Sequence, residues 1–131
     1  MPTLADAIAL ITALPEVTEG TSYGRPTWFV DGKSFAWERP FTKADIKRFG
    51  DEPVPDGPIL ALAVEDLADK AAALAAGNDG IFTIAHFDDY PAILVQLDVV
   101  ERTVLEEAIV DAWLASAPEP LARAFLSERD A

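Results

Sequence analysis

The side chains with the clearest binding chemistry are basic, and they are concentrated in one short part of the chain. Residues 25 to 48 hold six of the ten Lys and Arg residues and only three acids, so this segment has a net charge of +3 in a chain of net charge −13. Guanidinium and ammonium groups bind phosphates and carboxylates through charge-assisted hydrogen bonds. We therefore expect an anion-binding site with these candidate residues: Tyr23, Arg25, Arg39, Lys43, Lys47, Arg48 and, from a later loop, His86.

The same cations have a second interpretation. They can pair with acids on an otherwise acidic surface, and such exposed pairs contribute about 0 to 1 kcal/mol each. Six bases spread over this segment do not form a dense polybasic tract. Lys43 and Lys47 are four residues apart and share one helix face. Whether these cations meet at one site or pair with acids depends on where the fold places them.

His86 is the single histidine, and Asp88 and Asp89 follow it closely. Imidazole and carboxylates are metal ligands and can serve in acid–base catalysis. The other interpretation is that His86 hydrogen-bonds within its loop while the aspartates cap turns. The spaced ligands of known metal sites are absent, and no serine lies in a nucleophile elbow. We therefore predict no catalytic residue, no metal and no cofactor.

An aromatic hairpin precedes most of the basic residues. Asp31-Gly32 supplies the positive φ angles of a tight turn between two strands at residues 27 to 30 and 33 to 37. The strands carry Trp28, Phe29, Phe35 and Trp37, and alternate residues of a strand lie on opposite faces. One pair is expected in the core. The other pair is expected to be covered by a helix or a second subunit, or to stack on a planar ligand.

Hydrophobic periodicity and turn residues predict the remaining elements. Helices are expected at residues 3 to 14, 43 to 49, 65 to 76, from 103 to Pro118, and near the C-terminus, and strands at residues 59 to 64, 81 to 84 and 92 to 97. For the helix at 65 to 76, the predicted buried face is Leu67, Ala71, Leu74 and Ala75. For the helix after residue 103, the predicted buried face is Leu105, Ala108, Ile109, Ala112 and Trp113.

The element order is α-β-β-β-α-β-β-α, with hairpin links. This order predicts an α+β fold, a two-layer α/β sandwich with a five-stranded, mainly antiparallel sheet and helices on one face. We expect one domain at residues 1 to 131, with residues 118 to 131 as a short C-terminal helical extension. The chain has no cysteine, which excludes disulfides and cysteine-bound zinc. It has neither a secretion signal pattern nor an apolar run of about 20 residues, so we expect a cytoplasmic, bacterial-type protein that does not bind membranes.

Several motifs occur together in a distinctive order. They are EGTSYGRP at residues 19 to 26, ahead of the aromatic hairpin, FTIAHF at 82 to 87, YPAILV at 90 to 95, and Ala112-Trp113. With these motifs the chain resembles the MmcQ/YjbR family over roughly residues 4 to 118. The resemblance implies a two-layer α/β fold related to secretion chaperones and frataxin-like proteins. It also implies a "double-wing" DNA-binding role without an assigned enzymatic activity.

The leading hypothesis is a non-enzymatic binding domain. Its site is a groove between residues 23 to 25, the helix at 43 to 48 and the His86 loop, and its partner is DNA, by resemblance, or another protein. The chain's acidity opposes nonspecific DNA coating. One alternative is a metal- or histidine-dependent small-molecule enzyme that uses His86, Asp88 and Asp89. Another is a chaperone-like homodimer whose interface is the aromatic hairpin, so both a monomer and a homodimer remain open.

Overall fold

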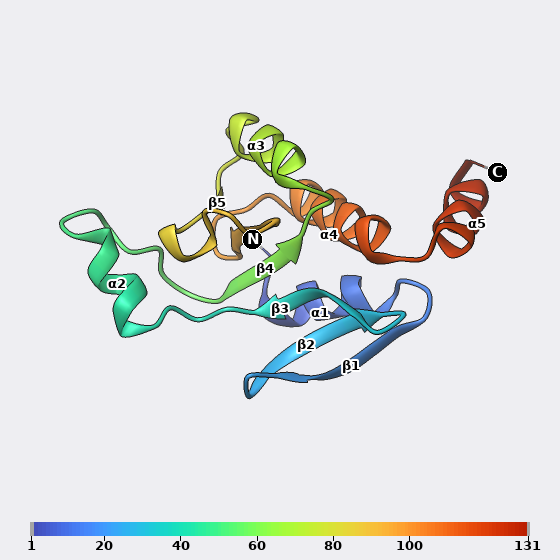
Figure 1. Ribbon diagram of the computed structural model, residues 1–131, viewed down its shortest axis with the longest axis horizontal. Coiled ribbons are helices and arrows are strands. Elements are labelled where there is room, and N and C mark those ends of the chain that lie inside the picture. The colour runs from blue at the N-terminus through green and yellow to red at the C-terminus, as the bar shows by residue number, and fades with distance from the viewer. Residues whose placement is uncertain (1, 131) are drawn as a thin grey trace.

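One antiparallel sheet organises the molecule. The computed structural model describes residues 2–130, and its sheet has six strands in the order β1-β2-β3-β4-β6-β5, with every neighbouring pair antiparallel. Figure 1 shows α3 and α4 on one side of the view, β1 and β2 on the other, and α2 and α5 at opposite ends. The elements are α1 Leu4–Thr12, β1 Val17–Ser22, β2 Arg25–Val30, β3 Lys33–Glu38, α2 Lys43–Phe49, β4 Ile59–Ala63, α3 Leu67–Ala75, β5 Ile81–Phe82, the 3-10 helix η1 Ala85–Phe87, β6 Ala92–Gln96, α4 Arg102–Ser116 and α5 Glu119–Asp130.

The predicted α+β fold is confirmed, with one strand more than expected. The additional strand is β1, which pairs with β2 from Val17↔Val30 to Ser22↔Arg25. The sequence suggested only a polar connection here, because none of its residues is fully buried and no apolar alternation marks it. A hairpin turn at Tyr23 and Gly24, with φ angles of 53° and 75°, joins β1 to β2. Backbone pairing with β2 is what makes this segment a strand.

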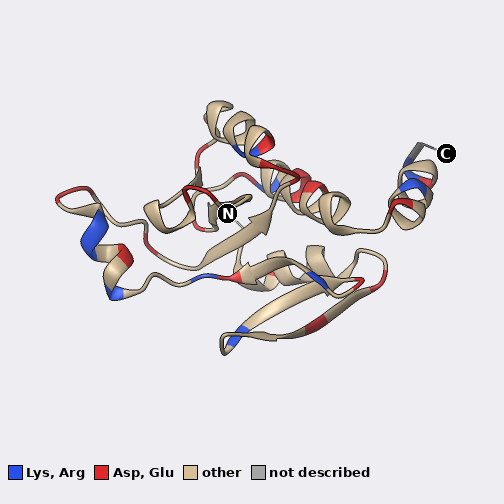
Figure 2. Ribbon diagram, in the orientation of Figure 1, with Lys and Arg blue, Asp and Glu red and all other residues tan. Residues whose placement is uncertain are grey.

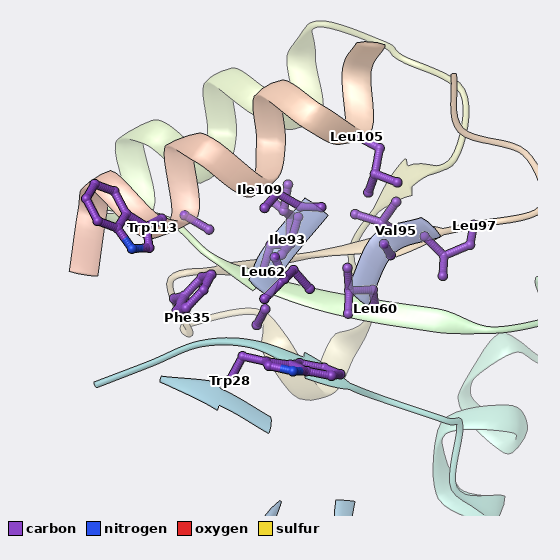
Figure 3. Close-up of a cluster of buried hydrophobic side chains, with 14 of the residues drawn as sticks. Trp28, Phe35, Leu60, Leu62, Ile93, Val95, Leu97, Leu105, Ile109 and Trp113 are labelled. Carbon is purple, nitrogen blue, oxygen red and sulfur yellow. The ribbon is translucent and has the colours of Figure 1, made fainter. Parts of the chain in front are cut away.

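The larger core lies between the sheet and the layer of α1 and α4. Trp28, Leu60 and Leu62 of the sheet are buried in the same cluster as Ile109 and Trp113 of α4 (Figure 3). The predicted buried face of the helix after residue 103 is confirmed, with Ala108 partly buried and the other four residues buried. Each large apolar side chain buried in this way contributes roughly 1.5–3 kcal/mol. The Phe125 ring of α5 packs at 4.9 Å from the Trp113 ring, measured between centroids.

A bulge in the hairpin of β2 and β3 distributes its aromatic side chains. Trp28 pairs with Ala36, but Phe29 pairs with Ser34, so β3 has one extra residue, Phe35, at this point. Because of the extra residue, Phe35 and Ala36 both belong to the main core, whereas Trp37 packs on the opposite face of the sheet. Strict alternation would have placed Phe35 and Trp37 on the same face.

The opposite face of the sheet has a smaller core. Ile59, Ala61 and Leu94 of β4 and β6 are buried there together with Phe87 of η1. Four aromatic side chains pack around this cluster, and they are Trp37, Phe41, Phe49 and Phe82. The short elements α2 and η1 thus cover this face near β4 and β6, and the β2–β3 end of the face borders a pocket. No helix within residues 2–130 has the length and hydropathy to cross a membrane.

The predicted buried face of the third helix was wrong for three of its four residues, and Leu74 alone is partly buried. In α3, Ala71 and Ala75 are exposed and the Leu67 side chain is 47% exposed, whereas Lys70 is buried. The helix turns Lys70 toward the backbone of residues 87 to 90, where its Nζ is a second donor to the Phe87 and Tyr90 carbonyls, each of which also accepts a backbone N–H group.

Candidate binding pocket

A pocket of about 530 Å³ opens between the β2–β3 hairpin and residues 86 to 90. Its lining combines three basic side chains, four aromatic side chains and four hydroxyl groups. These are Arg25, Arg39 and His86; Tyr23, Trp37, Phe87 and Tyr90; and Ser22, Thr27, Ser34 and Thr42. A volume of this size falls within the range of about 300–1,000 Å³ that is typical of small-molecule sites. We call it the Arg25 pocket.

Two arginines of the pocket meet at one backbone oxygen. Arg25 Nη1 donates to the Pro40 carbonyl at 3.1 Å, and Arg39 Nη1 donates to the same oxygen at 2.7 Å. Arg25 reaches this position from the first residue of β2, and Arg39 from the residue after β3. The antiparallel pairing of β2 with β3 brings the two ends together. Two positive charges therefore lie beside each other at the edge of the pocket.

Only one of these arginines is neutralised by a carboxylate. Arg39 Nη1 lies 2.9 Å from Asp45 Oδ2, and Arg48 Nη1 lies 3.8 Å from Asp45 Oδ1. No ion pair among the described residues involves Arg25. Arg25 is therefore the arginine of the pocket without a carboxylate partner among the described residues, while Arg39 is held by its partners.

Asp45 is held in place by the start of α2. Its carboxylate accepts a hydrogen bond from the Thr42 backbone N–H at 2.9 Å, and its own N–H donates to the Thr42 hydroxyl at 3.1 Å, which completes a capping box. Burial by itself raises the pKa of Asp45, but the hydrogen bonds from Thr42 and Arg39 outweigh burial and hold the pKa below its ordinary value.

Aromatic rings form one wall of the Arg25 pocket. Trp37 contacts Phe87 and Tyr90 at centroid distances of 6.5 and 6.2 Å, and the Phe87 and Tyr90 rings are 5.6 Å apart. The Arg39 guanidinium lies 5.5 Å from the Phe87 ring centroid, within cation–π range. Tyr90 is about half exposed at 49%, and Tyr23 is fully exposed at 100%. The wall thus has a packed base and an open rim.

Lys70 positions this wall, and sequence reasoning missed it. Its Nζ donates to the carbonyls of Phe87 and Tyr90, the latter at 2.9 Å. Burial lowers the pKa of Lys70, while the carboxylates of Asp88 and Asp89 act in the opposite direction. A lysine in an alanine-rich helix gives no local signal of such a role, since the carbonyls that it serves are 17 and 20 residues away in the chain.

The structure divides the predicted site residues into two groups. Tyr23, Arg25, Arg39 and His86 line the Arg25 pocket. The others, Lys43, Lys47 and Arg48, are exposed on α2 and do not line it. Figure 2 shows the blue segments of α2 at one end of the molecule.

The His86 loop does not gather metal ligands. Within residues 2–130, no three His, Asp or Glu side chains form a group that could hold a metal ion. His86 lies in η1, with its ring 5.9 Å from the Phe87 ring, and Asp88 is the C-cap residue of η1.

Another hollow, of about 610 Å³, lies between α3 and α4 and has the opposite electrostatic character. Its rim includes Glu65, Asp69, Glu107 and Asp111, and no basic side chain lines it. Burial, followed by the nearby Glu107 carboxylate, raises the pKa of Asp111, as expected where negative charge accumulates. An anion is therefore repelled at this hollow and attracted at the Arg25 pocket.

The fold and the pocket define a class: an α+β protein with one antiparallel sheet, a helical layer on its larger core, and a cationic, aromatic-walled pocket on the other face. The chain belongs to the YjbR family, whose model matches residues 12–115. It is 41% identical over 130 residues to the uncharacterised proteins Mb2600 of Mycobacterium bovis and Rv2570 of Mycobacterium tuberculosis, covering 97% of this chain and 98% of each relative. No solved structure matches the chain significantly.

Proposed function

We propose that this YjbR-family protein is a cytoplasmic, non-enzymatic binding domain that engages an anionic group of its partner in the Arg25 pocket. The observation that carries the proposal is the Arg25 guanidinium, which faces the pocket beside a second guanidinium and has no carboxylate partner among the described residues. A guanidinium presents paired N–H donors that match phosphate and carboxylate oxygens. The cytoplasmic part of the proposal depends on the cysteine-free composition.

Two of the four Ser and Thr hydroxyls that line the pocket already serve the fold, which favours binding over catalysis at those positions. The Thr27 hydroxyl donates to the Arg25 carbonyl at 3.1 Å, and the Thr42 hydroxyl caps α2. A nucleophile needs a base within hydrogen-bonding reach that is itself oriented by a third group. These two hydroxyls have structural partners instead, so the lining is suited to holding a ligand.

The test compares two variants that each remove one positive charge from the β2–β3 hairpin. Pyrophosphate is titrated into wild-type protein, Arg25→Gln and Lys33→Gln, with backbone amide chemical shifts as the readout, at low and high salt. Lys33 is the matched control because it is exposed and does not line the pocket. We expect salt-sensitive shifts around residues 22 to 27, 39 to 42 and 86 to 90 in wild type and Lys33→Gln, and their loss in Arg25→Gln. Equal responses of all three proteins, or shifts confined to other residues, would contradict the proposal.

Duplex DNA is a second candidate partner, and α2 is the observation that favours it. Lys43 and Lys47 are exposed, one helical turn apart, and have no ion-pair partner among the described residues. Exposed lysines on one helix face can contact successive phosphates of a nucleic acid backbone. This surface lies outside the Arg25 pocket, so the two candidate partners depend on different residues.

A further inference from the structure

We infer that the ligand of the Arg25 pocket is a small planar aromatic molecule with an anionic group, of the chemical class of a nucleoside monophosphate. This inference rests on the proposed function and adds to it a requirement for a ring. The inference follows from two features of one pocket of about 530 Å³. The pocket holds an arginine without a carboxylate partner among the described residues, and beside it an aromatic wall with an open rim.

The aromatic wall provides a surface for a planar ring. The Trp37, Phe87 and Tyr90 rings are in mutual contact, which fixes their orientation, and they come from two segments of the chain that are distant in sequence. Tyr90 remains half exposed at the rim. Its exposed face is available to a planar ring, and base-on-aromatic stacking contributes roughly 1–3 kcal/mol.

The anionic group is assigned to Arg25 and not to Arg39. The Arg39 side chain is only 11% exposed, because Asp45, the Pro40 carbonyl and the Phe87 ring surround its guanidinium. Arg25 uses one N–H group for Pro40, which orients its guanidinium and leaves other donors for a ligand. Asp45 offsets the charge of Arg39, so the attraction for an anion depends mainly on Arg25.

Tyr23 supplies an independent observation at the rim. It is fully exposed and has a φ of 53°, a left-handed conformation that is unfavourable for an aromatic residue. Full exposure means that packing within the chain does not compensate for the strain. The hairpin turn requires a positive φ here, but glycine or asparagine would adopt it at lower cost, and strained residues of this kind are concentrated at ligand sites. Tyr23 is thus placed to cover a ring that lies against Tyr90 and Trp37, since all three side chains line the same pocket.

The shape of the site favours a free small molecule over a double helix. Bases in a duplex are stacked and paired, so one of them must be extruded before it can enter a pocket. A free nucleotide presents its ring and its phosphate together without that cost. The same chemistry also occurs at the end of a single strand, and the experiment must separate these two sources.

The experiment separates the ring from the anionic group. AMP, adenosine and ribose 5-phosphate are each titrated by calorimetry into wild-type protein, Arg25→Gln, Tyr90→Leu and the control Lys33→Gln, with circular dichroism to verify folding. Adenosine has the ring without the phosphate, and ribose 5-phosphate has the phosphate without the ring. We expect AMP to bind about tenfold or more tightly than either fragment, from one charge-assisted contact and one stacking contact.

The variants assign each contribution to a residue. Arg25→Gln should remove the advantage of AMP over adenosine, Tyr90→Leu should remove its advantage over ribose 5-phosphate, and Lys33→Gln should retain both. If ribose 5-phosphate binds as tightly as AMP and Arg25→Gln weakens both, the ring requirement is wrong while the proposed function stands. If Arg25→Gln changes no affinity, both are wrong. A single-stranded oligonucleotide that binds more tightly than AMP, with the same dependence on Arg25 and Tyr90, would overturn the assignment to a free ligand.

Discussion

Among individual residues, Asp45 determines which arginine of the basic segment is available to a ligand. Its carboxylate is almost completely buried and contacts both Arg39 and Arg48. Two of the three arginines of this region, Arg39 and Arg48, therefore share one acid, and Arg25 lies outside its reach. Without Asp45 the buried Arg39 would have no counter-charge, a situation that typically costs several kcal/mol.

Replacement of Asp45 should destabilise the protein in a pH-dependent way. The pKa of Asp45 is held below its ordinary value of 3.8, so its ionised form stabilises the fold fully above that pH, and the contribution is lost as pH falls through the lower folded-state pKa. We expect Asp45→Asn to lower the free energy of unfolding by about 2 kcal/mol at pH 7.

Urea denaturation at pH 7 and at about pH 3 measures this effect. The difference between wild type and Asp45→Asn should shrink at the lower pH, because the Asp45 carboxyl of the unfolded chain, with its ordinary pKa of 3.8, then takes up a proton and favours unfolding. Asp31→Asn is the control, since it removes one exposed acid and should change stability by less than about 0.5 kcal/mol. A deficit in Asp45→Asn that is equal at both pH values would show that the carboxylate's charge is not its source.

Among the elements, the two hairpin turns differ in how clearly their own residues predict them. Asp31-Gly32 has φ angles of 50° and 76°, as its sequence predicts, because aspartate and glycine tolerate the left-handed region. The β1–β2 turn has nearly the same angles at Tyr23 and Gly24. Tyrosine is a poor choice for that conformation, so the turn is not recognisable from its sequence.

Replacement of Tyr23 by asparagine should stabilise the protein. Asparagine tolerates a positive φ better than tyrosine does, and no packing is lost because the Tyr23 side chain is fully exposed. We expect Tyr23→Asn to raise the free energy of unfolding by about 1 kcal/mol in thermal or urea denaturation. Tyr23→Ala is the matched control, because alanine removes the ring without relieving the backbone. Equal stabilisation by both variants would attribute the gain to loss of the ring instead.

At the scale of the whole molecule, charge is unevenly distributed. The chain has a net charge of −13, yet α2 carries three exposed bases at one end (Figure 2). Fields from exposed charges decay over about 8 Å at physiological salt. The acidic remainder therefore weakens but does not cancel the local attraction of α2 or of the Arg25 pocket for an anion.

If duplex DNA binds the exposed lysines of α2, reversing their charges should abolish that binding. Lys43→Glu/Lys47→Glu should abolish duplex binding measured by fluorescence anisotropy, and wild-type affinity should fall steeply with salt because phosphate contacts release counterions. Arg48 is left unchanged, since it lies near the buried Asp45 and its reversal would disturb the fold. Arg25→Gln should retain DNA binding. DNA affinity that is insensitive to salt, or unchanged in the double variant, would refute a DNA role for α2.

Features that depend on local sequence were predictable. The Asp31-Gly32 hairpin, the buried face of α4 and the antiparallel α+β architecture follow from turn chemistry and from hydrophobic periods of two and 3.6 residues. The clustering of bases in residues 25 to 48 also pointed to the segment that contributes Arg25 and Arg39 to the pocket. Each of these signals comes from residues only a few positions apart.

Features that depend on contacts between distant residues required the tertiary structure. The pairing of β1, the bulge at Phe35 and the burial of Lys70 are set by neighbouring strands and by carbonyls far along the chain. The same holds for the site, where Arg25 meets the carbonyl of Pro40, 15 residues away. Sequence alone determined which charges this protein has and where they are concentrated. Only the folded chain decided which charge is neutralised and which faces a pocket, because burial and ion pairing depend on distances in space.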